Sequence, residues 1–150
     1  MIINTPNINE VRKQIQKIRK ENEKEEIIII AQDTVFNRKI LEMKEVDIIL
    51  GLERHSRKDK LKQRDSGLNE VLCKLAKENN IKIGIDIDAL KKLNKKDKAK
   101  IISRIIQNIS LCNKIGSQII IFPKGKYNKL DVQAFLISLG SSTQMARSAV

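Results

Sequence analysis

Four short runs of branched apolar residues place the strongest constraint on the fold of this chain. The runs are IIIIA at 27–31, VDIILGL at 46–52, IKIGIDI at 81–87 and QIIIF at 118–122. Each run is too short and too rich in isoleucine for a helix, and a strand that is apolar along its length is buried on both faces. Burial on both faces is typical of parallel sheets that helices cover, so the runs predict a parallel sheet.

Amphipathic segments alternate with the four runs. Helices are predicted at residues 11–20, 36–43, 68–79, 98–115, 131–140 and 143–150. The helix at 68–79 has apolar residues at helical spacing on one face: Leu68, Val71, Leu72 and Leu75. Alternating strands and helices predict an α/β fold with right-handed crossovers, and 150 residues suit a single domain over 1–150. Four clear strands are too few to close an eight-stranded barrel.

The charge of the chain points to a polyanionic partner. The sequence has a formal net charge of +12 and a pI of about 9.8, with 41% hydrophobic and 32% charged residues. Nucleic acid and an anionic membrane surface are the two natural partners of such a chain. The apolar runs are far shorter than the roughly 20 residues that span a bilayer, and no signal peptide is recognisable. We therefore expect a cytoplasmic protein with no membrane partner.

The basic residues gather in loops that follow predicted strands. Residues 53–65 carry six cations and three anions (net +3), residues 86–98 five and three (net +2), and residues 123–129 three and none (net +3). The link at 20–26, which precedes a strand, has a net charge of −2. Because loops after parallel strands emerge at one edge of a sheet, we expect a one-sided basic surface that binds phosphate backbones. The alternative is a lysine-rich, solvated surface with no partner.

The first of these loops, ERHSRKDKLKQRD at 53–65, is the main candidate for RNA binding. Arginine offers phosphate a planar fork, and lysine offers it a point charge. The candidate RNA-binding residues are Arg54, His55, Arg57, Lys58, Lys60, Lys62, Arg64, Lys124, Lys126 and Tyr127. Asp65 and Ser66 stand where the N-cap of the next helix belongs, and Gly67 and Asn69 are expected to set the turn that positions the loop.

Residues for a self-sufficient catalyst are scarce. The one histidine, His55, lies within the basic loop, where we expect a surface or RNA-contacting role, and the GxGxxG, P-loop and GxSxG motifs are absent. Asp86 and Asp88 follow a strand, where carboxylates can be catalytic, but capping of the next helix is their more frequent use. Cys73 and Cys112 are expected to be buried free thiols. We predict no catalytic residue and no metal site in this chain.

One long segment resembles a known family. Residues 54–87, RHSRKDKLKQRDSGLNEVLCKLAKENNIKIGIDI, are similar to the signature of the archaeal ribonuclease P protein component 3 family, an arginine-rich loop followed by a D/N-S-G-L-N-x-V-L helix. The matching positions are Arg54, Arg57, Arg64, Asp65, Ser66, Gly67, Leu68, Asn69, Val71 and Leu72. Weaker likeness extends to Gln32, Asp33, Asn37 and Arg38, and to residues 102–116 and 136–150.

The resemblance implies a TIM-barrel-like fold and a role as a protein subunit of ribonuclease P, the endoribonuclease that removes the 5′ leader from precursor tRNA. In that enzyme the RNA subunit is the catalyst and uses Mg²⁺, so this chain would bind the RNA without catalysing cleavage. The implied partners are ribonuclease P RNA, ribonuclease P protein component 2 and precursor tRNA. Family members begin with a further strand and helix before the segment that matches 11–20, so we expect a barrel-like sheet that is incomplete at its N-terminus.

Two other functions fit the sequence. A stand-alone metal-dependent phosphoesterase or nuclease of barrel type would use the same basic edge for its substrate, although the histidine cluster of such enzymes is absent. Such an enzyme would retain a divalent ion and cleave RNA by itself. A protein-interaction subunit would instead place the basic edge against an acidic partner surface.

Overall fold

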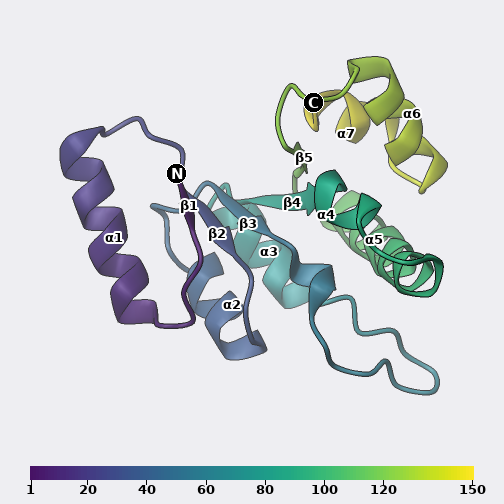
Figure 1. Cartoon of the computed structure of the whole chain (residues 1–150), viewed down its shortest axis with the longest axis horizontal. Coiled ribbons are helices and arrows are strands. Elements are labelled where there is room, and N and C mark those ends of the chain that lie inside the picture. The colour runs from purple at the N-terminus through teal and green to yellow at the C-terminus, as the bar shows by residue number, and fades with distance from the viewer.

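The computed structural model describes residues 1–150 and contains one sheet of five parallel strands (Figure 1). The strands are β1 (Ile2–Ile3), β2 (Ile28–Ile30), β3 (Ile48–Leu50), β4 (Lys82–Asp86) and β5 (Ile119–Phe122). They lie side by side in chain order, and each is parallel to its neighbour. The predicted α/β fold with a parallel sheet is therefore confirmed.

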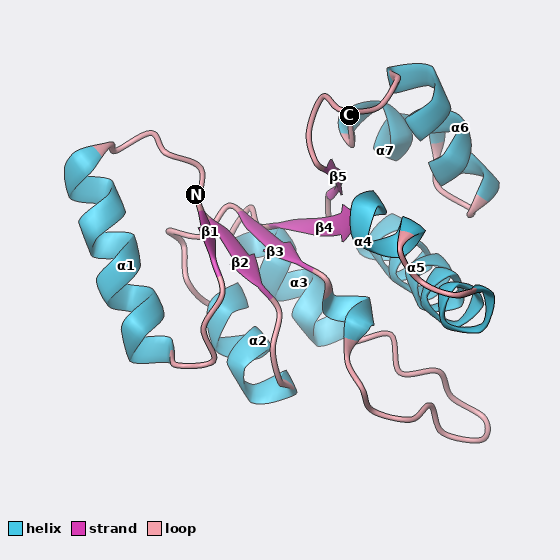
Figure 2. Cartoon of the chain, in the orientation of Figure 1, coloured by secondary structure: helices cyan, strands magenta, loops and turns pink.

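Helices connect the strands and follow the last one (Figure 2). They are α1 (Ile8–Glu21), α2 (Thr34–Leu41), α3 (Glu70–Glu78), α4 (Ile87–Lys91), α5 (Lys95–Ile115), α6 (Lys129–Ser138) and α7 (Thr143–Ser148), with a 3₁₀ helix, η1 (Leu52–Arg54), after β3. All six predicted helices are present, with shifted ends. The sequence does not predict the strand β1 or the helix α4, because such short elements show no measurable periodicity of apolar residues. None of the helices is both long and apolar enough to cross a membrane.

Side chains alternate between the two faces of the sheet. Ile29 and Ile49 lie in the main hydrophobic core, which includes the apolar faces of the helices. Ile28 and Ile48, one position earlier in each strand, lie in a second cluster on the opposite face. Both faces of the sheet are therefore apolar, which is what the uninterrupted isoleucine runs predict.

The sheet is open. Its edges are β1 and β5, and no pairing joins them. The N–H group of Ile121 donates to the carbonyl oxygen of Ala149 (2.9 Å), so the C-terminal segment contacts β5 directly. The barrel-like form predicted for this incomplete sheet is not shown, because the sheet is not closed, although its strands follow the consecutive order that β/α barrels use.

Candidate nucleic-acid interface

The segment between β3 and α3 makes a long excursion away from the sheet (Figure 1). Residues 53–65 of this segment are called the basic loop below. Gly51 precedes η1 with a φ of +83°, in the left-handed region that favours glycine. At His55 the backbone becomes extended, and Lys60 and Gln63 then pair as an isolated antiparallel bridge. Residues 60–63 therefore form the turn at the tip of the basic loop.

A buried arginine holds the first half of the basic loop. Arg104, on α5, has 0% of its surface exposed. Its guanidinium donates to three carbonyl oxygens, those of Glu53 (2.9 Å), His55 (2.9 Å) and Arg57 (2.8 Å). It also donates to Oδ1 of Asp59 at 3.2 Å. Because a buried charge is tolerated only when its donors are hydrogen-bonded, these four acceptors tie the loop to α5.

Asp65 holds the second half of the basic loop against the first. Its carboxylate accepts hydrogen bonds from Nε and Nη2 of Arg57 (2.8 and 3.3 Å) and from the N–H group of Gly67 (3.0 Å). The hydrogen bonds from Arg57 are the main reason that the pKa of Asp65 falls to about 2. The N–H group of Asp65 in turn donates to Oδ1 of Asp59 (2.9 Å). The base of the loop is thus a network of opposite charges.

Two titratable side chains are buried at this base. The predicted surface role of His55 is wrong, because its side chain is only 7% exposed and its Nε2 lies 2.8 Å from the carbonyl oxygen of Asp65. Burial, and after it the Arg104 guanidinium, lowers the pKa of His55. Glu53 is 1% exposed, and its Oε2 has no hydrogen-bond partner. Burial raises the pKa of Glu53 to about 7.

The start of α3 differs from the prediction. Its N-cap is Asn69, whose Oδ1 accepts from the N–H group of Leu72 (2.9 Å), so the capping role predicted for Asp65 and Ser66 is wrong. Val71 is 56% exposed and does not anchor the helix, whereas Leu72 is buried as predicted. The core-facing side of α3 carries Leu72, Cys73 and Ala76.

Gly67 joins the basic loop to the core. Its φ is +80°, and a Cβ atom at this position would lie 2.0 Å from the carbonyl oxygen of Leu52. No side chain can occupy that space, so the chain requires glycine here. Ser66, beside it, is buried, and its carbonyl oxygen accepts from Nδ2 of Asn108 on α5 (3.2 Å). The turn at residues 66–67 is therefore fixed from both sides.

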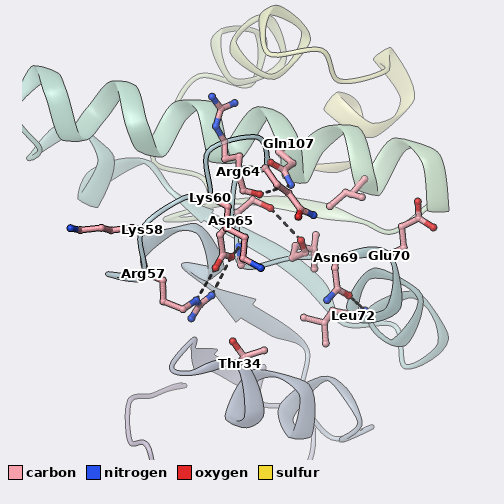
Figure 3. A pocket seen from close by; sticks show the side chains of 15 residues that line it. Thr34, Arg57, Lys58, Lys60, Arg64, Asp65, Asn69, Glu70, Leu72 and Gln107 are labelled. Carbon is pink, nitrogen blue, oxygen red and sulfur yellow. Dashed lines mark hydrogen bonds and ion pairs between the residues drawn. The ribbon is translucent and has the colours of Figure 1, made fainter.

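Four cations remain free at the outer end of the loop. The ion pairs of the loop use Arg54, His55, Arg57, Asp59 and Asp65. The tip cations, as we call the remaining ones, are Lys58, Lys60, Lys62 and Arg64. Among them only Arg64 has a side-chain contact, a hydrogen bond of 3.4 Å to the carbonyl oxygen of Ser103. A pocket between the loop, α2 and α5 is lined by three of them, with Lys58 and Arg64 pointing outward in different directions (Figure 3).

In a further predicted basic loop, at residues 123–129, two of the three cations form ion pairs within the chain. Lys126 pairs with Asp88 (2.6 Å), and the hydroxyl of Tyr127 donates to the same carboxylate. Lys124 pairs with Glu26. The prediction that the acidic 20–26 link lies apart from the basic loops is therefore wrong at Glu26. No hydrogen bond or ion pair connects this loop with the basic loop.

The carboxylates and thiols considered from the sequence have structural partners. Asp86 caps α4, because its Oδ1 accepts from the N–H group of Ala89 (2.9 Å), so the capping prediction is confirmed for Asp86. Cys73 and Cys112 are free and buried, as predicted, with their Sγ atoms 3.8 Å apart. No three His, Cys, Asp or Glu side chains lie close enough together to hold a metal ion.

The anchoring role of Arg104 predicts a large effect on stability. Replacing Arg104 with Met leaves buried carbonyl oxygens without donors, so we expect the free energy of unfolding to fall by about 3 kcal/mol. Urea unfolding followed by circular dichroism measures this change. Arg147→Met, at an exposed site with no ion pair, is the matched control. Equal stability of the two variants would contradict the anchoring role.

The buried carboxylate of Glu53 predicts a pH dependence of stability. Its folded-state pKa of about 7 exceeds the ordinary value of 4.5, so the unfolded state loses its proton first as the pH rises. Stability should therefore fall between about pH 4.5 and pH 7, by on the order of 3 kcal/mol, and then level off. Glu53→Gln should remove this fall when unfolding is compared at pH 5 and pH 8. Glu78→Gln, at an exposed site, should leave it unchanged; a fall that persists in Glu53→Gln refutes the assignment.

Comparison with known proteins gives the fold and the sequence family of this chain. No protein-family model matches it. A chain in the cryo-EM structure of archaeal ribonuclease P with mature tRNA superposes on it with a TM-score of 0.77 and 24% identity, over 99% of this chain and 62% of that one. At this level of identity, the likeness shows a shared fold.

Two curated relatives carry the same name. Ribonuclease P protein component 3 of Methanococcus maripaludis strain C6 is 31% identical over 119 residues, which are 79% of this chain and 47% of that protein. The Methanococcus vannielii protein of the same name is 32% identical over 115 residues, 77% of this chain and 46% of that protein. The chain thus spans about half the length of these relatives. The predicted resemblance is confirmed: over the matched region, this chain is a homologue of ribonuclease P protein component 3.

Proposed function

We propose that this chain is a protein subunit of ribonuclease P that binds the RNA subunit and supports endonucleolytic removal of the 5′ leader from precursor tRNA. The similarity to ribonuclease P protein component 3 is the observation that carries the proposal. The RNA subunit with Mg²⁺ would be the catalyst, and ribonuclease P protein component 2 would be the protein partner in the cytoplasm. The five strands would form one part of a TIM-barrel-like sheet within a single domain.

The construction of the basic loop supports RNA as the ligand. The base of the loop is fixed by Arg104 and Asp65, so its backbone need not be ordered when a ligand binds. The four tip cations have no carboxylate partner, so they can replace the counterions of a phosphate backbone without breaking an internal ion pair. Release of those counterions is the main source of affinity in such complexes.

The few aromatic residues indicate how RNA would be recognised. Aromatic residues make up only 3% of the chain, and the hydroxyl of Tyr127 already binds Asp88. Stacking on bases is therefore a minor contribution. We expect the loop to contact phosphates and to recognise the shape of the RNA more than its base sequence.

The tip cations predict a specific salt dependence. Replacing Lys58, Lys60, Lys62 and Arg64 together with Gln should reduce the slope of log K against log salt concentration by about 3, because each phosphate contact contributes roughly 0.7 to 0.9. Filter binding of the ribonuclease P RNA at several salt concentrations measures this slope.

The matched control for this variant lies on α1, far from the basic loop (Figure 1). This helix carries four exposed cations that form no ion pair: Arg12, Lys13, Lys17 and Lys20. Their replacement with Gln removes as many positive charges as the tip variant does. The slope should change much less in the control than in the tip variant. Equal slopes for the two variants would show that net charge, and not the basic loop, determines RNA binding.

Reconstituted cleavage tests the proposed function directly. Precursor tRNA is incubated with the RNA subunit and ribonuclease P protein component 2, with and without this chain, and with the chain alone. We expect the chain to increase cleavage only when the RNA subunit is present. Cleavage by the chain alone would instead indicate a metal-dependent nuclease, and a failure to increase cleavage would refute the subunit role.

A further inference from the structure

A second pocket opens at the edge of the sheet where the first three strands end. Asn4 follows β1, Gln32 follows β2, and Arg54 follows β3, and all three side chains line it. Lys100 and Arg104 on α5 form another wall. The carboxyl ends of parallel strands are the usual place for ligand sites in α/β folds, because the loops that follow the strands converge there. This pocket shares none of its lining residues with the pocket beside the tip cations.

Arg54 offers unused donors to this pocket. Its guanidinium makes no hydrogen bond, and its Nη2 forms a long ion pair with Oδ2 of Asp86 (3.7 Å). The side chain is 31% exposed, so a ligand can reach it. Gly51 makes room for it, because a Cβ atom on Gly51 would lie 2.9 Å from both Nε and Nη2 of Arg54. Glycine at position 51, just after β3, therefore leaves the space that this guanidinium occupies.

The remaining lining groups add donors and positive charge. The charged lining residues are three cations, Arg54, Lys100 and Arg104, and one anion, Asp97, a formal net charge of +2. Arg54 and Arg104 are also paired with Asp86 and Asp59, so Lys100 is the cation of the pocket without an ion pair. The side chain of Lys100 forms no ion pair or hydrogen bond, and Nε of Arg104 is buried without an acceptor. Asn4 accepts from Gln32 through Oδ1 (3.0 Å), which leaves its Nδ2 free to donate.

We propose that this pocket binds a phosphate group. The residues that line this cavity carry a guanidinium fork, an ammonium group and an amide N–H group, which are the donors that a tetrahedral anion requires. The affinity of the pocket for phosphate does not depend on the function proposed above, whereas RNA as the source of that phosphate rests on it. Two groups of an RNA present such a phosphate: a terminal phosphate monoester and a backbone phosphodiester.

Inorganic phosphate provides the first test. Its titration into the ¹⁵N-labelled full chain, at constant ionic strength against chloride, should shift the amide resonances of Gly51, Arg54 and Lys100. The Lys100→Gln variant changes an exposed side chain that forms no hydrogen bond or ion pair, and it should weaken binding at least fivefold, and Arg54→Gln at least tenfold. Lys13→Gln with Lys17→Gln, on α1, should leave the affinity unchanged. Equal shifts with phosphate and chloride, or equal losses in the pocket and α1 variants, would overturn the proposal.

Short oligoribonucleotides identify the source of the phosphate. If a 5′-phosphorylated strand binds at least tenfold more tightly than its 5′-hydroxyl form, and Arg54→Gln removes the difference, the pocket holds a terminal monoester. If both strands bind equally and Arg54→Gln weakens both, the pocket holds a backbone diester. If Arg54→Gln weakens neither strand, RNA is not the source. If the chain does not increase cleavage but still binds phosphate through Arg54, the ribonuclease P role is refuted and the phosphate site is not.

Discussion

The buried guanidinium of Arg104 is the interaction on which the basic loop depends. Six cations within residues 54–64 repel one another, and a free segment of this kind would remain extended and mobile in water. Arg104 adds a seventh cation beneath them, yet it stabilises the loop because its donors meet backbone carbonyls at 53, 55 and 57 and the carboxylate of Asp59. The desolvation of one charge is thus offset by hydrogen bonds that fix the loop backbone.

The loop divides its charges between support and binding. Near the base, Arg57 is neutralised by Asp65, and that pair closes the loop. Toward the tip, the cations have no such partners and keep their full attraction for external anions. The formal net charge of the loop does not reveal this division, because it depends on which carboxylates fold back onto which cations. The same is true of Lys124 and Lys126, whose partners Glu26 and Asp88 lie 98 and 38 residues away.

The sequence alone predicts the parts of this fold that follow from local pattern. Isoleucine runs identify β2 to β5, and helical spacing identifies all the long helices, because each signal lies within a few neighbouring residues. The sequence predicts the wrong cap for α3, because Asp65, Ser66 and Asn69 are all good N-caps, and tertiary contacts select Asn69. The sequence does not predict the anchoring role of Arg104, because a lone arginine in an amphipathic helix normally faces water. The signal in the sequence that it faces inward is its place three residues after Ile101 and next to Ile105, in the i, i+3, i+4 pattern of apolar residues.

Helix α5 connects the two proposed phosphate-binding regions. Ser103 and Gln107 contact Arg64 near the tip, Arg104 holds the base of the loop, and Lys100 lines the pocket at the strand ends. Residues 100 and 104 lie one turn apart, as do 103 and 107, so two adjacent stripes of one helix serve the two regions. Because Arg104 both anchors the loop and lines the pocket, its removal disturbs both regions at once. Lys100 lines the pocket and forms no hydrogen bond or ion pair with the basic loop, so it is the residue through which the two regions can be separated.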